Sequence, residues 1–503
     1  MTGQPVSDAS PSAKRTHPRG LSTLFFTEMW ERFSYYGMRA LLVLFMTATI
    51  ADGGLGFDDV TATAIYGLYT AAVYLVSLPG GWIADRLIGA QRCVWYGAIV
   101  IMLGHFILAI PAVPTFFIGL IFVVLGTGLL KPNISAIVGK LYPQGGAACD
   151  AGYTIFYIGI NLGAMLGPLV CSTLGESASF GWHYGFAAAG VGMLVGIIQF
   201  KLSKHHLGEA GLYPAHLQSG LDKISAPRYG WLYVNTGLAL IALVTALMLS
   251  GVIQIEALAL AKSATYVIAA LAAGFFVYLY LFGQLDSTEK KQVAVIMILV
   301  ACAAVFWSGF EQTGSSMNLF AERYTERNFG GFEIPAGWFQ SINATCILIF
   351  SPFLAALWIN LAKRNLNPSI PLKFALGLIQ LGLGFLVMVF AAKLVVSGET
   401  VLPTWLAMTY MLHTMGELCL SPVGLSAISK LAPKRFASQM MGIWFLGFSL
   451  GNLLAGLLAG RFDPNQIEHM PALYLQIAAM SLAAGILMIV FLKPIKSLMG
   501  KVE

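Results

Sequence analysis

One short stretch of the sequence concentrates ionisable side chains within an apolar run. Between Thr27 and Arg39 the polar positions follow the spacing i, i+3, i+4, i+7, i+8 and i+11, which places them on one continuous face of an α-helix. They are Glu28, Glu31, Arg32, Tyr35, Tyr36 and Arg39. Two carboxylates and two guanidiniums on one face cannot contact lipid, so we expect this face to line a polar cavity.

The spacing also indicates how these groups pair. Arg32 follows Glu28 by one helical turn and can pair with it, whereas we expect its neighbour Glu31 to pair only loosely. One carboxylate is then left to exchange a proton. A ligand carboxylate is a natural alternative partner for Arg32, because arginine binds carboxylates through two parallel hydrogen bonds. The stretch therefore predicts a site where ligand binding and protonation are linked.

The composition places this helix in a membrane. The 503 residues are 57% hydrophobic and only 10% Asp, Glu, Lys or Arg, whereas soluble chains carry about 25% charged residues. The mean hydropathy is +0.76. These values exclude a soluble enzyme, a nucleic-acid-binding protein and a disordered scaffold. The six cysteines are scattered without a CxxC pair, so we expect neither disulfides nor a metal site.

The chain contains fourteen apolar stretches that are long enough to span a bilayer. They are residues 21–50, 62–84, 92–111, 114–135, 151–174, 182–200, 229–251, 264–284, 292–320, 336–360, 372–396, 401–428, 437–460 and 471–492. An even number places both termini on one side. With this topology 21 of the 29 basic residues lie on the side of the termini and five on the other, which predicts cytoplasmic termini by the positive-inside rule.

Apart from Arg92, Lys373 and Lys393, which lie at span ends and are counted with the loops, seven charged side chains fall inside these spans. Besides the four on the first helix they are Lys131, Glu311 and Glu417. Charged groups at membrane depth are costly, and they mark ligand or ion pathways by default. His105, His183 and His413 are isolated, and we interpret them as structural or loop residues.

The sequence also contains an internal duplication. Residues 132–143 resemble residues 422–433, and residues 156–163 resemble residues 444–451. Each copy covers the end of a fourth helix and part of a fifth helix, if the stretches 229–251 and 264–284 are an insertion between two six-helix halves. The duplication predicts a six-plus-two-plus-six arrangement of parallel halves, which is typical of transporters with a site near the midplane.

At this point a resemblance to a known family is specific. The stretch E-x-x-E-R-F-x-Y-Y-G (residues 28–37) resembles the signature of the proton-coupled oligopeptide transporter (POT, also PTR) family of the major facilitator superfamily. Further family blocks occur in order, namely GGWIADRLIG (80–89), GTGLLKPN (126–133), FYIGINLG (156–163), FW with EQ (306–307 and 311–312) and GELCLSP (416–422). The resemblance covers essentially the whole chain. The fourteen-helix form is similar to bacterial members of the family.

The resemblance implies an all-α integral membrane protein with the major facilitator fold. The expected parts are a cytoplasmic tail (1–20), a six-helix bundle (21–200), a linker with two inserted helices (201–291), a second six-helix bundle (292–492) and a cytoplasmic tail (493–503). It implies a proton-coupled symporter of di- and tripeptides, located in the bacterial inner membrane and functional as a monomer. Its partners are peptide, protons and the lipid bilayer, with no cofactor, metal or nucleic acid.

A zwitterionic dipeptide needs one site for its carboxylate and another for its amine. Arg32 and Lys131 suit the carboxylate, and Glu417 with Asn161 and Asn343 suits the amine. Tyr36, Tyr74 and Trp444 are candidates for contacting peptide side chains. The resemblance implies the same roles, and it adds two charge pairs that form and break as the protein opens on alternate sides, Arg39 with Glu311 and Lys131 with Glu417.

The proton must be carried by carboxylates, because animal family members use a histidine in the second helix that residues 60–84 lack. The candidates for proton coupling are Glu28, Glu31 and Glu311, together with Arg32.

Two alternatives remain open. The first is a family member for another solute, such as an anion or a peptide-like drug; nitrate has no amine, so Glu417 favours peptides. The second is a membrane-embedded enzyme, which needs a nucleophile with a base or a metal cluster. The sequence has no HExxH motif and no His/Asp pair at helical spacing. We therefore expect a secondary active transporter rather than an enzyme.

Overall fold

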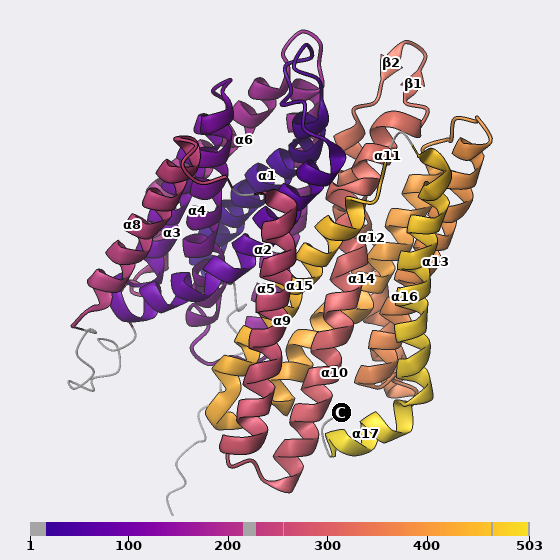
Figure 1. The fold of residues 1–503 in the computed structure, drawn as a ribbon. Helices are drawn as coiled ribbons and strands as arrows, with labels where there is room; N and C mark the ends of the chain where they lie inside the picture. Colours follow the sequence, from indigo (N-terminus) through magenta and orange to yellow (C-terminus); the bar gives the residue numbers. More distant parts are fainter. Residues whose placement is uncertain (1–16, 215–227, 255, 464–465, 501–503) are drawn as a thin grey trace, which may run out of the picture.

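The computed structural model describes residues 17–214, 228–254, 256–463 and 466–500 (Figure 1). The first half contains α1 (Gly20–Thr47), α2 (Asp59–Ile83, continued by a π-helical turn, Ala84–Ile88), α3 (Ala90–Leu108), α4 (Val113–Lys140), α5 (Gly146–Gly175), α6 (Trp182–Ser203) and a 3₁₀ turn (Lys204–Leu207). Two further helices follow, α8 (Gly230–Leu249) and α9 (Ala257–Phe282).

The second half begins with α10 (Ser287–Phe310), a 3₁₀ turn (Glu311–Gly314), α11 (Ser316–Tyr324), a hairpin of β1 (Asn328–Phe329) and β2 (Phe332–Glu333), and a 3₁₀ turn (Ala336–Gln340). It continues with α12 (Ser341–Lys363), α13 (Ile370–Val396), α14 (Thr404–Leu431), a 3₁₀ turn (Lys434–Phe436), α15 (Ala437–Ala459), a 3₁₀ turn (Ile467–His469), α16 (Met470–Val490) and α17 (Leu492–Met499).

The helices account for the predicted membrane spans. Within the described residues, twelve helical segments are long and apolar enough to cross a membrane, judged by length and composition. The other two long helices are α1 and α14, which carry polar side chains of the predicted site. Together they match the fourteen apolar stretches of the sequence and the all-α class.

The internal duplication has a counterpart in the packing. In the first half α5 crosses α1 at Gly159 and Gly163, where an added side chain would strike Phe25 and the backbone of Met29. In the second half α15 crosses α10 in the same way, and its glycines Gly447 and Gly451 have no room for a side chain beside Val300 and Trp307. The fifth helix of each half thus packs closely on the first, because glycines let the two backbones approach each other.

The two inserted helices do not pack on each other as a hairpin. α9 packs against α2 and α15, where the two halves meet, whereas α8 lies beside α4 (Figure 1). The central window of α8 has no buried residue. Its apolar surface is what a helix in contact with lipid requires.

The structure differs from the sequence prediction in two places. The stretch 292–320 is expected to be one span, but the helix breaks at Glu311–Gly314 and restarts as α11. The side chain of Gln312 donates to the backbone oxygens of Ser308 and Ala455, so polar contacts stabilise the interruption. The predicted C-terminal tail contains a helix, α17.

The halves are joined at the end of the bundle that carries β1 and β2, which we call the hairpin end; the opposite end, which carries α17, is the terminal end (Figure 1). Arg323 of α11 forms two hydrogen bonds of 2.7 and 2.9 Å with Asp59 of α2. Asn318 of α11 donates to the backbone oxygen of Ala40 on α1 at 2.8 Å. Glu176, directly after α5, accepts hydrogen bonds from the backbone of the other half, described below.

Candidate functional site

The first helix carries a buried charge cluster. Glu28, Glu31 and Arg32 are 2, 0 and 4% exposed. The Nε atom of Arg32 lies 2.8 Å from Glu28 Oε1, with a hydrogen bond, and 2.8 Å from Glu31 Oε2. The expectation that Glu31 pairs only loosely is therefore wrong, because both carboxylates lie at the same distance from Arg32. Both are buried and have this cation in common. Only Glu28 is aligned for a hydrogen bond.

Some polar atoms of the charge cluster have no hydrogen-bond partner among the described residues. Within the described part of the chain, Arg32 Nη2 and Glu28 Oε2 are buried without a hydrogen-bond partner. A buried polar atom without a partner is costly, and at a binding site it is commonly reserved for a ligand. The Nη2 group of Arg32 is thus available to donate hydrogen bonds to an added acceptor.

A second cation stands close to this cluster. Lys131 lies on α4 directly before Pro132, and it interacts electrostatically with Arg32, Glu28 and Glu31. Its Nζ atom lies 4.0 Å from the ring centroid of Tyr74 on α2. With two cations and two carboxylates the cluster is close to neutral, so the charge of an added ligand carboxylate is balanced when one glutamate takes up a proton.

Glu417 lies in the other half, on α14. Its Oε2 atom accepts a hydrogen bond of 3.0 Å from Asn343 Nδ2 on α12, and the same amide donates to Thr414 Oγ1 at 2.9 Å. Two of the three residues expected to bind an amine therefore lie together. The third, Asn161, is 4% exposed on α5, and its amide donates to the backbone oxygen of Tyr157.

Glu417 and Lys131, expected to pair across the halves in the resting state, form no ion pair in this structure, although both belong to its described residues. Lys131 instead lies against the ring of Tyr74, and Glu417 against Asn343. The physical reason is the arrangement of the halves, because the hydrogen bonds and ion pairs between them lie toward the hairpin end.

The other implied pair is present. Arg39 Nη2 on α1 lies 2.9 Å from Glu311 Oε2 at the break after α10, and both side chains are nearly buried. Tyr66 on α2 donates its hydroxyl to the same carboxylate oxygen at 3.2 Å. Sequence reasoning missed Tyr66, one of three tyrosines in the apolar span 62–84. The signal was its hydroxyl, because a buried tyrosine hydroxyl usually has a polar partner.

The aromatic candidates differ in accessibility. Tyr36 and Tyr74 are partly exposed, whereas Trp444 is 1% exposed. The indole of Trp444 packs over Gly424 and between Phe374 and Phe448. The expectation that Trp444 contacts the peptide therefore does not fit this conformation, because the missing side chain at Gly424 provides a buried place for its ring.

One serine resembles a hydrolase nucleophile by sequence alone. Ser449 stands in the run GFSLG, which matches G-x-S-x-G. That motif requires a sharp turn between a strand and a helix, but Ser449 lies inside α15 and its hydroxyl donates to the backbone oxygen of Ala71 at 3.2 Å. The serine joins the two halves and has no exposed nucleophilic geometry.

The chain is similar along most of its length to known proteins. Residues 91–473 match the model of the POT family. The chain is 43% identical over 498 residues to the peptide transporter YePEPT of Yersinia enterocolitica, covering 97% of this chain and 96% of the relative. It is 35% identical to a di-/tripeptide transporter of Lactococcus lactis subsp. cremoris, covering 97% of each chain.

Solved structures show the same fold. A peptide transporter of this family in complex with alafosfalin superposes with a TM-score of 0.87 at 39% identity, covering 97% of each chain. A second family member, in complex with 5-aminolevulinic acid, superposes with a TM-score of 0.85 at 32% identity, covering 96% of this chain and 98% of its own.

Proposed function

Because the chain belongs to the POT family, we propose that it is a proton-coupled symporter that imports di- and tripeptides by alternating access. Family membership confirms the predicted fold and the prediction of a secondary transporter rather than an enzyme. It also confirms a multi-pass membrane protein. The observation that carries the peptide assignment is a cationic site on one half and a carboxylate site on the other.

The peptide is held between the halves by its two charged ends. Its carboxylate binds Arg32, whose Nη2 is without a partner in the described residues, and the nearby Lys131. Its amine binds Glu417, which Asn343 already orients, with Asn161 as a further ligand. Tyr36 and Tyr74 contact the side chains of the peptide, and Trp444 does so only in a conformation that exposes it.

Proton coupling follows from competition for Arg32. In this structure Glu28 and Glu31 share its Nε atom. When a peptide carboxylate takes the guanidinium, a glutamate loses its cation in a buried site and gains a proton in its place. The proton therefore binds with the peptide, and protons are the coupling ion. Glu311 is a second proton site, because it is a buried carboxylate whose cation partner is Arg39.

The structure supports a conformation closed at the hairpin end. Arg39–Glu311 and Asp59–Arg323 link the halves there, while Lys131 and Glu417 are apart. We place the termini in the cytoplasm, so that this state faces inward and the Lys131–Glu417 pair forms when the cytoplasmic side closes. The moving units are the bundles 21–200 and 292–492, which residues 201–291 join. The tails are residues 1–20 and 493–503. The functional unit is a monomer.

Uptake into proteoliposomes tests the proposal. We expect vesicles containing the purified protein to accumulate labelled dialanine when the outside is acidic, and an uncoupler to abolish the accumulation. Unlabelled alafosfalin, the ligand of the solved relative, tests the peptide-like drug alternative by competition. Vesicles that take up nitrate but not dialanine under the same gradient contradict the proposal and favour the anion alternative.

A further inference from the structure

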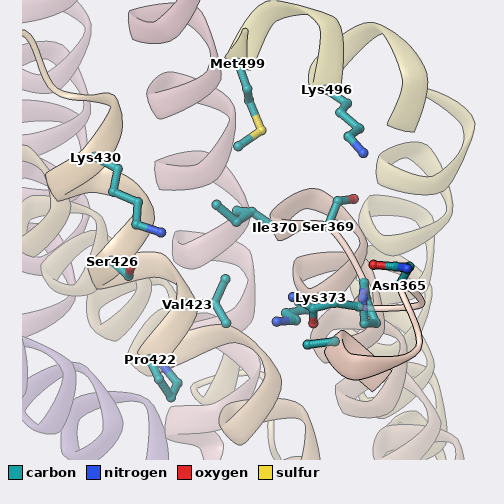
Figure 2. A pocket seen from close by; sticks show the side chains of 13 residues that line it. Asn365, Ser369, Ile370, Lys373, Pro422, Val423, Ser426, Lys430, Lys496 and Met499 are labelled. Atoms are coloured by element: carbon teal, nitrogen blue, oxygen red, sulfur yellow. The ribbon is translucent and has the colours of Figure 1, made fainter. Parts of the chain in front are cut away.

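A cavity of about 650 Å³ lies at the terminal end of the second half, away from the charge cluster described above (Figure 2). Its walls come from four elements: the end of α12 with the following loop, the first turn of α13, the part of α14 that follows Pro422, and α17. The cavity does not include the peptide-binding residues. It is therefore a separate site with its own chemistry.

Three lysines from three different helices line this cavity. They are Lys373 on α13, Lys430 on α14 and Lys496 on α17. In Figure 2 the side chains of Lys373 and Lys430 extend toward the space between them, and Lys496 reaches toward Ser369 from α17. Lys373 and Lys430 are close enough to repel each other electrostatically. An anion between these ammonium groups relieves that repulsion.

Neutral donors complete the lining. Asn365, Asn367 and Ser369 belong to the walls of the cavity. Ser369 is the N-cap residue of α13, and its hydroxyl does not cap the helix. The N-terminus of a long helix carries unpaired N–H groups and a partial positive charge, both of which favour a phosphate group. The lysines and the N-terminus of α13 thus both favour an anion in this cavity.

The surroundings of the cavity are apolar and exposed. The central window of α12 is 22% buried, the least of any predicted span of the second half within the described residues. Leu357 and Ile359 near its end are 46 and 57% exposed, and Leu366 in the adjoining loop is 64% exposed. Trp358 lies beside the ammonium of Lys373, 4.9 Å from its ring centroid. Such an edge accommodates acyl chains next to a charged headgroup.

We propose that this cavity binds the phosphate group of an anionic phospholipid from the membrane leaflet on the terminal side, with the acyl chains beside α12. Basic pockets between membrane helices on the cytoplasmic side are suited to such headgroups. The lipid links α12 and α14, which carry Asn343 and Glu417, so it stabilises the second half and modulates transport. The inference goes beyond peptide transport, because the lipid is neither substrate nor coupling ion.

Binding of defined lipids to the full-length purified protein tests the proposal. Cardiolipin, phosphatidylglycerol, phosphatidylcholine and inorganic phosphate are titrated separately, with native mass spectrometry and thermal unfolding as readouts. We expect the two anionic lipids to bind and to raise the unfolding temperature, and phosphatidylcholine to do neither. Inorganic phosphate is expected to compete only weakly, because it lacks the acyl chains.

The variant combines Lys373→Gln, Lys430→Gln and Lys496→Gln. Each lysine near an anionic headgroup is worth about a five-fold change in affinity, so the triple variant should bind cardiolipin at least twenty-fold more weakly. The matched control, Lys363→Gln with Arg364→Gln and Lys434→Gln, removes three cations from the same end outside the cavity lining. We expect it to bind cardiolipin nearly as well as the native chain.

Dialanine uptake in pure phosphatidylcholine vesicles checks that the triple variant is folded, and it should equal that of the native chain. If the triple variant does not fold, Lys496→Gln alone on α17 should still weaken cardiolipin binding. Unchanged binding in the lysine variants, or an equal loss in the control, overturns the proposal. A response to inorganic phosphate as strong as that to lipid, through the same lysines, overturns the lipid assignment.

Discussion

In the proposed mechanism, peptide binding and proton binding converge on Arg32. Its Nε atom forms ion pairs with two buried carboxylates, and its Nη2 atom has no hydrogen-bond partner within the described residues. The planar guanidinium can bind a ligand carboxylate with one edge while it releases a glutamate from another. A lysine at this position has a single point charge and cannot be shared in the same way.

The substitution Arg32→Lys should therefore abolish proton-driven uptake of dialanine, because the exchange between glutamate and peptide carboxylate is lost. Accumulation in proteoliposomes under an inward proton gradient measures this. The matched control is Arg364→Lys, the same exchange at the residue that follows α12, and it should accumulate dialanine as the native chain does. Full accumulation by Arg32→Lys would remove Arg32 from the coupling mechanism.

In the proposed site, Glu417 distinguishes substrates by their amine. Its carboxylate is oriented by Asn343 in a buried site of the second half, and a peptide ammonium is the cation that fits it. Glu417→Gln should weaken the binding of dialanine by at least ten-fold, because a charge-assisted hydrogen bond to a buried group is worth about 1.5–3 kcal/mol.

Competition against labelled dialanine in the native protein provides the complementary measurement. N-acetyl-dialanine has no charged amine, so we expect it to compete poorly. Equal competition by the two compounds would show that Glu417 does not bind the amine, and it would favour the alternative of an anion transporter.

At the scale of elements, α5 and the start of α12 close the hairpin end. Glu176, which follows the last residue of α5, accepts hydrogen bonds of 2.6 and 2.9 Å from the backbone N–H groups of Ala336 and Gly337. The carboxylate thus caps the 3₁₀ turn that leads into α12. Arg327 lies 3.9 Å from it and also pairs with Glu333.

This contact predicts a pH dependence of closure. Burial raises the pKa of Glu176 to about 7, against the opposing effects of the two N–H bonds and Arg327, with Glu322 adding a small increase. When the hairpin end opens and water reaches the carboxylate, we expect its pKa to return toward the ordinary value for glutamate. The closed state therefore binds the proton more tightly, and its extra stability is present at low pH and lost as pH rises through about 7.

Closure should accordingly be favoured at pH 5 relative to pH 7.5, by roughly ten- to fifty-fold. The reporter is Ser172→Cys, a buried position that faces Gly337 across the interface. Its labelling by a maleimide is followed by site-resolved mass spectrometry, and the rates are corrected for thiol ionisation. Adding Glu176→Gln should remove most of the pH dependence. An unchanged pH dependence in the Glu176→Gln variant would assign it to another group.

The elements also show what the sequence can predict. Apolar length and charge placement predict the long helices. The break at Glu311–Gly314 escapes this reasoning, because it depends on Gln312 reaching Ala455 and on Glu311 reaching Arg39, contacts between residues far apart in sequence. The burial of Trp444 is of the same kind, since it depends on Gly424 of another helix.

At the scale of the whole molecule, the charge cluster lies in one half and the amine site in the other. The sequence indicated the candidate residues of both, because charged groups in apolar spans are rare. It could not predict which pairs are formed, since in the proposed alternating-access cycle Arg39–Glu311 and Lys131–Glu417 form in different conformations. The observed state has the first pair and not the second, as closure of the hairpin end requires.

Coupling between the halves has an electrical consequence. A neutral dipeptide that enters with one proton moves one positive charge inward, which is worth about 2.3 kcal/mol per 100 mV, or roughly a fifty-fold accumulation. Vesicles with a potassium diffusion potential of about 100 mV, negative inside and without a pH gradient, should therefore accumulate dialanine toward that ratio. Reversing the potential should drive dialanine out of preloaded vesicles, and protein-free vesicles should respond to neither. Uptake that responds to a pH gradient but not to the potential would mean that a compensating charge moves with the peptide. The charges of the glutamates and Arg32 would then not sum to zero in the empty protein when its site returns to the opposite side.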